Sequence, residues 1–299
     1  MIPTPREGII VALWTPTDER GQLLTRELEA NLDFIRARNV HGIMPLGSTG
    51  EFVHFDTAQR KEILELVTRR VSPLPIIANI SNVRLAVVTE LATHARQIGC
   101  AAVTALPPWF FALAQADLVE FFVRAGEMAQ LPLFLYNFPE RTGQRISLET
   151  VAAVAARVPL AGVKQSGAEF SYHRELVQLG REKNFVVLTG ADTRLAEAMA
   201  LGVTGCVSGL ANVVPEVVLE IFHAVKAGTP AQAADAIRIM SAFGGLMDKL
   251  EFPLNVSAAM AARGRHVGLP KSIVSPATQA RYQALIAEVR QLLNEWKLT

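Results

Sequence analysis

The chain has 299 residues, half of them hydrophobic and 19% charged, which is typical of a globular protein whose core needs no disulfide or metal to stabilise it. Its formal net charge is +1 with acidic and basic residues interleaved, so no extended surface for nucleic acid is expected. The two cysteines, Cys100 and Cys206, indicate no disulfide framework, and we expect a reducing compartment, the cytoplasm.

Targeting and membrane segments are not expected. Residues 1–7 lack the basic stretch and apolar core of a secretory signal. No apolar run approaches the roughly 20 residues needed to cross a bilayer. We therefore predict no membrane partner.

Short apolar runs rich in β-branched residues recur along the first three quarters of the chain. Their continuous hydrophobicity is typical of strands buried on both faces, as in a parallel sheet. The runs span residues 8–13, 41–46, 74–78, 101–105, 133–136, 160–164, 185–189 and 205–208.

Helical patterns separate these runs. Leu28, Leu32 and Ile35 share one face of the first, and Asp56 is the predicted N-cap of the second. Eight such alternations predict an α/β fold, a (β/α)₈ barrel, with an open doubly wound sheet as the second choice. Only helical patterns follow, at 231–250, 253–262 and 278–296. We therefore expect a barrel domain at 1–229, which would hold any catalytic site, and a C-terminal helical region at 230–299.

The sixth run ends in Lys164, at the face where barrel enzymes carry their active sites. Burial there would disfavour the ammonium form and lower the pKa of the amine. A neutral amine can attack a ketone and form an imine. The alternative is a lysine whose ammonium group reaches water from the end of the strand.

Two more polar side chains follow the fifth run. Tyr136 ends it and could exchange protons with a neighbouring imine or alkoxide; an aromatic cap on the barrel core is the alternative. Arg141 could hold a substrate carboxylate through two parallel hydrogen bonds, and an ordinary surface arginine is the alternative.

The second run leads into a turn with the sequence Gly47-Ser48-Thr49-Gly50-Glu51. Glycine allows a sharp turn, and hydroxyl and backbone N–H groups suit a carboxylate. An ordinary strand-to-helix turn is the alternative. It is not a nucleotide-binding P-loop, because no Gly-Lys-Ser/Thr follows.

Metal and cofactor motifs are missing from the sequence. The six histidines are scattered, and none has metal-ligand spacing with Cys or carboxylate residues. There is no Gly-x-Gly-x-x-Gly fingerprint and no Gly-x-Ser-x-Gly elbow. We expect neither a metal nor an organic cofactor.

Together, the turn at residues 47–51, Tyr136-Asn137-Phe138-Pro139 and Gly162-Val163-Lys164 make the chain resemble the dihydrodipicolinate synthase / N-acetylneuraminate lyase family of pyruvate-dependent aldolases. The resemblance extends over nearly the whole chain. It implies a barrel with C-terminal helices and usually a homotetramer built as a dimer of dimers. It also implies a substrate held as a Schiff base without a cofactor.

The resemblance also assigns roles to residues. Lys164 matches the Schiff-base lysine and Tyr136 the proton-shuttling tyrosine. Ser48 and Thr49 match the pair that grips the keto-acid carboxylate, and Thr49 is counted with Lys164 and Tyr136 as catalytic. The implied small-molecule partners are a 2-keto acid and an aldehyde.

Three more positions match residues that line the family's pocket. Gly190, after the seventh run, and Val207, in the eighth, match positions whose backbone faces the substrate. Arg141 looks like the synthase arginine that binds the carboxylate of aspartate semialdehyde.

Two features depart from the synthases. They usually carry two threonines where this chain has Ser48-Thr49, a pair more like that of the sugar-acid lyases. Phe110 stands where synthases and many lyases have a tyrosine that reaches across the dimer interface. Because a phenyl ring cannot relay a proton, synthase activity is expected to be weak or absent.

Two classes of function therefore remain open. The first is a Schiff-base lyase or aldolase, with a 2-keto-3-deoxy sugar acid aldolase or dehydratase favoured over dihydrodipicolinate synthase. The second is a non-catalytic ligand-binding barrel, since a fold alone does not establish activity. Such a binder would be free to lose Lys164 or Tyr136, and both are present.

Overall fold

Parallel strands form the centre of the molecule in the computed structural model, which describes residues 3–298. Met1 and Ile2, part of the amino-terminal segment considered above, lie outside the described residues. The strands are β1 (Gly8–Ala12), β2 (Gly42–Met44), β3 (Ile77–Asn79), β4 (Ala102–Ala105), β5 (Leu133–Asn137), β6 (Leu160–Gln165), β7 (Val186–Thr189) and β8 (Gly205–Ser208).

Each predicted run overlaps one of these strands. The third strand begins later than predicted, at Ile77. Leu74 is in a turn, in which its N–H group donates to the carbonyl of Val71. Pro75 follows and has no N–H group for a strand ladder.

The strands close into a ring. Their order is β2-β1-β8-β7-β6-β5-β4-β3, with neighbours hydrogen-bonded in parallel. A parallel bridge between Ile43 and Ile76 joins β2 to the residue before β3. This closure confirms the barrel and excludes the open doubly wound sheet.

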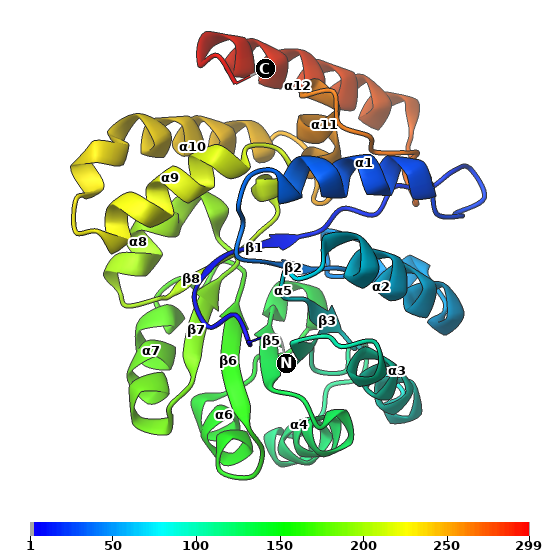
Figure 1. The fold of residues 1–299 in the computed structure, drawn as a ribbon, viewed down its shortest axis with the longest axis vertical. Coiled ribbons are helices and arrows are strands. Elements are labelled where there is room, and N and C mark those ends of the chain that lie inside the picture. Colours follow the sequence, from blue (N-terminus) through cyan, green and yellow to red (C-terminus); the bar gives the residue numbers. More distant parts are fainter. Residues whose placement is uncertain (1–2, 299) are drawn as a thin grey trace.

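Helices surround the ring (Figure 1). Asp56 caps α2 as predicted, because its side chain accepts the Gln59 N–H at 2.8 Å. The helices up to residue 226 are α1 (Thr25–Arg36), α2 (Thr57–Val71), α3 (Leu85–Gln97), α4 (Gln115–Ala129), α5 (Pro139–Thr142), α6 (Leu148–Ala155), α7 (Tyr172–Lys183), α8 (Leu195–Ala200) and α9 (Pro215–Lys226). Among residues 3–298, no helix has the length and apolar character needed to cross a membrane.

Alternation along the strands divides the core into two layers. In β1, Ile10 and Ala12 point into the barrel, whereas Ile9 and Val11 face the helices, as the two-residue period of a strand requires. The barrel interior is filled by Ile10, Ala12, Met44, Ile77, Ala102, Phe134, Ala161, Leu188 and Val207. A filled interior leaves the carboxyl ends of the strands as the place for a site.

The C-terminal helices gather beside α1 and α9 (Figure 1). They are α10 (Ala234–Met247), α11 (Leu254–Ala262) and α12 (Pro276–Glu295), after a 3₁₀ turn at Pro230–Ala233. The segment between α11 and α12 lies along the end of β1. There the indole Nε1 of Trp14 donates to the carbonyl of Val267 at 2.9 Å. The C-terminal region is thereby attached to the barrel at the carboxyl ends of the strands.

Candidate active site

Lys164 and Tyr136 meet inside the barrel at the ends of adjacent strands. They are paired in the register of β5 and β6. The Nζ atom of Lys164 lies 3.9 Å from the centroid of the Tyr136 ring. The residues are 4% and 2% exposed. The alternative interpretation of Lys164, a lysine whose ammonium group reaches water from the end of the strand, is therefore wrong.

A β-bulge in β6 gives Lys164 this direction. Leu133 pairs with Leu160, but Phe134 pairs with Gly162, so Ala161 is an extra residue on β6. Because side chains alternate along a strand, one extra residue changes the face to which every later side chain points. Lys164 therefore joins Tyr136 on the inner face.

Gly162 is required at this bulge. A Cβ atom there would lie 2.7 Å from the Phe134 ring, which fills the barrel below Lys164. The glycine of the Gly162-Val163-Lys164 sequence is therefore explained by packing.

A cavity of about 290 Å³ opens around Lys164. Six of the residues singled out in the sequence line it: Thr49, Tyr136, Arg141, Lys164, Gly190 and Val207. Gly190 has no room for a side chain, since a Cβ atom would lie 2.0 Å from Ser166 Oγ and 3.4 Å from Lys164 Cε. Backbone therefore borders the lysine on this side.

Ser48 lines a second cavity, of about 280 Å³, adjacent to the first. Its hydroxyl oxygen lies 3.2 Å from the hydroxyl oxygen of Tyr136. Thr49 lines the Lys164 cavity instead. Ser48 and Thr49 therefore line different cavities. The contact between Ser48 and Tyr136 connects the two cavities.

Arg141 and Phe252 border both cavities. Arg141 belongs to α5, directly after β5, and its side chain is exposed. The guanidinium carbon lies 5.5 Å from the centroid of Phe252 and 5.9 Å from that of Phe138. Within residues 3–298 it forms no ion pair, so its charge is available at the mouth of the site.

Asp192 was not singled out from the sequence, yet it lines the Lys164 cavity. Its carboxylate accepts a hydrogen bond from the Ser208 hydroxyl. Burial of the carboxyl group raises its pKa, and hydrogen bonds from Ser208 and the following backbone, together with the charge of Lys164, oppose that shift. As a whole, the residue has intermediate exposure because it borders the cavity. Its position two residues after Gly190, at a strand end, was the available signal.

The C-terminal region also contributes to the Lys164 cavity. Met247, Phe252, Asn255 and Val256 all line it. Nothing in their helical pattern distinguished them from core residues. The site is therefore built from both parts of the chain.

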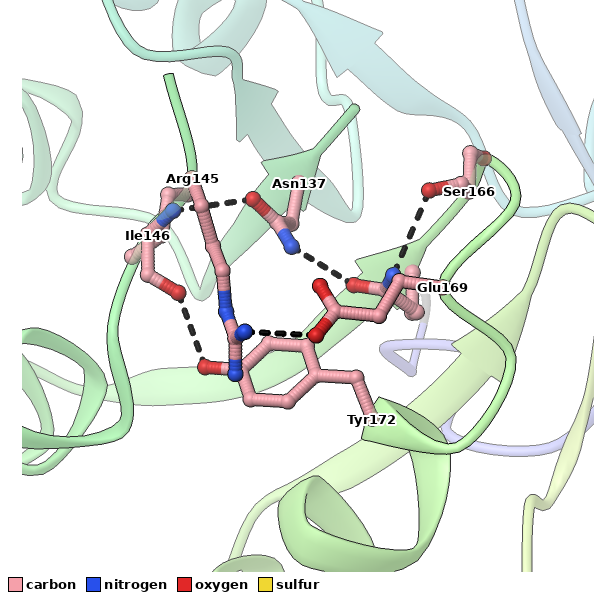
Figure 2. A network of polar contacts seen from close by, with 7 residues as sticks. Asn137, Arg145, Ile146, Ser166, Glu169 and Tyr172 are labelled. Carbon is pink, nitrogen blue, oxygen red and sulfur yellow. Dashed lines mark hydrogen bonds and ion pairs between the residues drawn. The ribbon is translucent and has the colours of Figure 1, made fainter. Parts of the chain in front are cut away.

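A buried polar layer joins the ends of β5 and β6 (Figure 2). Asn137 follows Tyr136 and donates through Nδ2 to the side-chain oxygen of Gln165, the residue after Lys164, at 2.7 Å. Asn137 Oδ1 accepts the backbone N–H of Ile146 at 2.9 Å. Both amide residues are 0% exposed. These bonds hold the ends of β5 and β6 in one register.

An outer shell of contacts supports this layer (Figure 2). The guanidinium group of Arg145 pairs with Glu169 at 2.5 Å and stacks over the Tyr172 ring. The Tyr172 hydroxyl donates to the Ile146 carbonyl at 2.8 Å, and burial raises the pKa of Tyr172 to about 12. The phenol therefore remains a donor near neutral pH.

Phe110 lies outside both cavities. It is 87% exposed, has a left-handed backbone with φ +79°, and packs edge-on against Phe111 with ring centroids 4.8 Å apart. Among residues 3–298 no cluster of three or more His, Cys, Asp or Glu residues could hold a metal ion.

The chain matches the model of the Dihydrodipicolinate synthetase family over residues 5–292. A 4-hydroxy-tetrahydrodipicolinate synthase of Methanothrix thermoacetophila is 26% identical over 293 residues, covering 97% of this chain and 99% of that protein. YagE, a prophage protein of the dihydrodipicolinic acid synthase family from E. coli K12 solved with pyruvate, superposes with a TM-score of 0.89 at 26% identity over 97% of this chain and 99% of that one. CdNal from Clostridium difficile, solved with mannosamine, superposes with a TM-score of 0.87 at 21% identity over 96% and 100%. At that identity the likeness concerns the fold.

Proposed function

The chain belongs to the dihydrodipicolinate synthetase family, and from this premise we propose that it is a class I aldolase or lyase that holds pyruvate, or another 2-keto acid, as a Schiff base on Lys164. The observation that carries the proposal is the buried amine of Lys164, 3.9 Å from the Tyr136 ring in a cavity of about 290 Å³. The pyruvate in the E. coli relative supports the choice of keto acid. A non-catalytic barrel is set aside because the relatives are named as enzymes.

The reaction begins when the Lys164 amine gives up a proton and attacks the keto carbon. Protonation and loss of the keto oxygen as water gives the iminium ion. Removal of a proton from the adjacent carbon gives an enamine, which attacks an aldehyde carbon and forms the C–C bond. Hydrolysis of the new iminium ion releases the product, and the reverse sequence cleaves an aldol substrate.

Tyr136 is the proposed acid and base for these proton transfers. Its hydroxyl group is 3.2 Å from that of Ser48, which borders the second cavity. Protons would pass between the Lys164 cavity and solvent through this pair of hydroxyl groups. Phe110 has no hydroxyl group and cannot extend the relay.

The acceptor is proposed to carry a carboxylate, because Arg141 borders both cavities and forms no ion pair among the described residues. A 2-keto-3-deoxy sugar acid, cleaved or dehydrated, is the favoured substrate class. Condensation of pyruvate with aspartate semialdehyde is the second candidate, since a relative aligned over 97% of this chain bears the synthase name.

Borohydride trapping tests the chemistry. Wild-type protein incubated with pyruvate and borohydride should gain one reduced pyruvoyl unit per chain in intact mass, located on Lys164 by peptide mapping. Lys164→Ala should show no adduct. A full adduct at another lysine defeats the assignment.

A substrate comparison separates the two candidates. Pyruvate release should be measured over keto-deoxy sugar acids and sialic acid, beside condensation with aspartate semialdehyde. Turnover of a sugar acid with weak condensation is expected. Condensation at a kcat/KM above roughly 10⁴ M⁻¹s⁻¹, within the ordinary range for an enzyme on its own substrate, would instead make the chain a synthase.

We also propose a cytoplasmic homotetramer, as the family resemblance implies. The exposed aromatic pair of Phe110 and Phe111 beside the site supports burial of this loop against a second copy. Sedimentation velocity should give about four times the chain mass of 32.5 kDa. A monomer at micromolar concentration contradicts the proposed assembly.

A further inference from the structure

Lys271 is a second buried lysine near the proposed site, and the mechanism above does not use it. Its Nζ atom lies 2.8 Å from Glu51 Oε2, with side chains 2% and 11% exposed. The amine also lies 4.6 Å from the centroid of the Trp14 ring. Lys271 lines neither of the two cavities described above. It is therefore directed at a carboxylate and not at a substrate.

Glu51 closes the turn that carries Ser48 and Thr49. Its backbone N–H donates to the carbonyl of Ser48 at 3.1 Å, and its φ of +56° is left-handed. A residue other than glycine keeps such a conformation only where its surroundings impose it. The turn also packs closely against Leu13, the residue after β1. A Cβ atom at Gly50 would lie 2.8 Å from the carbonyl oxygen of Leu13.

The segment that carries Lys271 is itself fixed to the residues that follow β1. The N–H of Leu269 donates to the carbonyl of Thr17 at 2.7 Å. Gly268 pairs with Thr17, and a Cβ atom there would lie 2.4 Å from the carbonyl oxygen of Thr17. Together with the Trp14–Val267 bond, these contacts hold Lys271 beside the turn.

We propose that Lys271 is a positioning residue of the keto-acid site: paired with Glu51, it fixes the turn that presents Ser48 and Thr49, so that the C-terminal region completes a site whose reacting groups lie in the barrel. The inference rests on the proposed function. Glu51 itself lines the second cavity, where its side chain is 11% exposed. Loss of Lys271 leaves this partly buried carboxylate without its cation, which is disfavoured where little water reaches the charge. The turn is then no longer held toward the C-terminal region.

The first experiment measures pyruvate binding in Lys271→Met. Adduct formation with borohydride is followed by intact mass at increasing pyruvate concentration. The variant should need roughly tenfold more pyruvate for half-maximal adduct, equivalent to about 1.4 kcal/mol of lost binding free energy, and still reach one adduct per chain on Lys164. Lys249→Met is the matched control, because Lys249 pairs with Glu288 at a surface where both side chains are about half exposed. It should match wild type.

A second pair of variants separates positioning from general stability. Removing both charges in the double variant Glu51→Gln, Lys271→Met should restore the thermal midpoint toward wild type while half-saturation stays high, because the turn has lost its tether. Lys271→Arg keeps the cation and should recover part of the affinity. The proposal is overturned if the double variant regains both stability and affinity, or if folded Lys271→Met half-saturates like wild type. Wild-type protein without an adduct on Lys164 would defeat the proposed function itself.

Discussion

Lys164 reaches the barrel interior because of one extra residue, Ala161, in β6. The sequence predicted a lysine at a strand end, and the run of apolar residues carried that information. The β-bulge could not be predicted from the apolar run, because a shift of one residue in register depends on how β5 and β6 pair. Asp192 was missed for a similar reason: its burial arises from contact with Ser208 on the neighbouring strand.

Replacing Tyr136 by Phe removes the proposed proton carrier and keeps the ring that packs beside Lys164. The value of kcat should fall by about 10²–10⁴, the range for a positioned acid or base. Tyr282→Phe is the matched control, since its hydroxyl also meets a serine, Ser257, at 2.9 Å but lines neither cavity. Steady-state kinetics with a turned-over substrate gives the comparison. Equal kcat values for the two variants would remove Tyr136 from the mechanism.

Replacing Arg141 by Ala removes the charge-assisted contact proposed for the acceptor, of a kind worth roughly 1.5–3 kcal/mol. The kcat/KM for an acidic acceptor should fall about tenfold to a hundredfold. Arg141→Lys keeps the charge but loses the planar fork, so an intermediate loss is expected. Trapping of pyruvate alone should stay near wild type. Loss of trapping without any change in acceptor preference would assign Arg141 to the keto acid instead.

The elements that carry the site are joined by amide side chains as well as by backbone. Asn137 links β5 to β6, and Asn212 links β8 to β1 by donating to the carbonyl of Ala12 at 2.7 Å. Sequence patterns gave the strands because continuous apolar runs identify them. Sequence patterns did not predict these links. An asparagine beside a strand end has the same sequence context whether its side chain faces water or a neighbouring strand.

Breaking one link should destabilise the fold more than an average substitution. In Asn137→Leu the N–H group of Ile146 and the side-chain oxygen of Gln165 lose their partners. At about 1–3 kcal/mol for each buried unsatisfied group, the free energy of unfolding should drop by roughly 2–6 kcal/mol. Urea denaturation measures it. The double variant Asn137→Leu, Gln165→Leu should lose less than the sum of the single losses, and strict additivity would show that the two amides act independently.

At the scale of the whole molecule, two histidines, the buried His173 and the partly buried His41, make stability depend on pH. Burial lowers the pKa of His173, which contacts the hydroxyl group of Thr189 at 3.0 Å, and burial also lowers the pKa of His41. The unfolded chain then binds more protons than the folded one near and below the ordinary histidine pKa of 6.5, so stability falls as pH falls through this range.

The free energy of unfolding should therefore be lower at pH 5.5 than at pH 7.5. His173→Asn should show a smaller difference between the two pH values, and His41 should account for part of what remains. Urea titrations at both pH values test this. An unchanged difference in the variant would mean that His173 does not contribute.

The barrel could be predicted from the sequence because continuous apolar runs indicate strands buried on both faces, and because eight strand–helix units is the number that closes a (β/α)₈ ring. The contribution of the C-terminal region to the site was not. Phe252 and Asn255 reach the cavity because the chain returns to β1 through the contact between Trp14 and Val267. The two residues of that contact are 253 positions apart in the sequence. Local hydrophobic periodicity therefore cannot predict it.

Closure of the ring between its first and last strands has a consequence for the newly made chain. Trp14 donates its backbone N–H to Asn212, 198 residues later, and β1 pairs with β8. At the usual synthesis rate of about 5–20 residues per second, β1 waits roughly 10–40 s for its neighbour to leave the ribosome. During that interval an apolar strand edge stays open to other nascent chains. The Ser48–Thr49 turn, which Lys271 contacts through Glu51, can take its final form only after Lys271 has been synthesised.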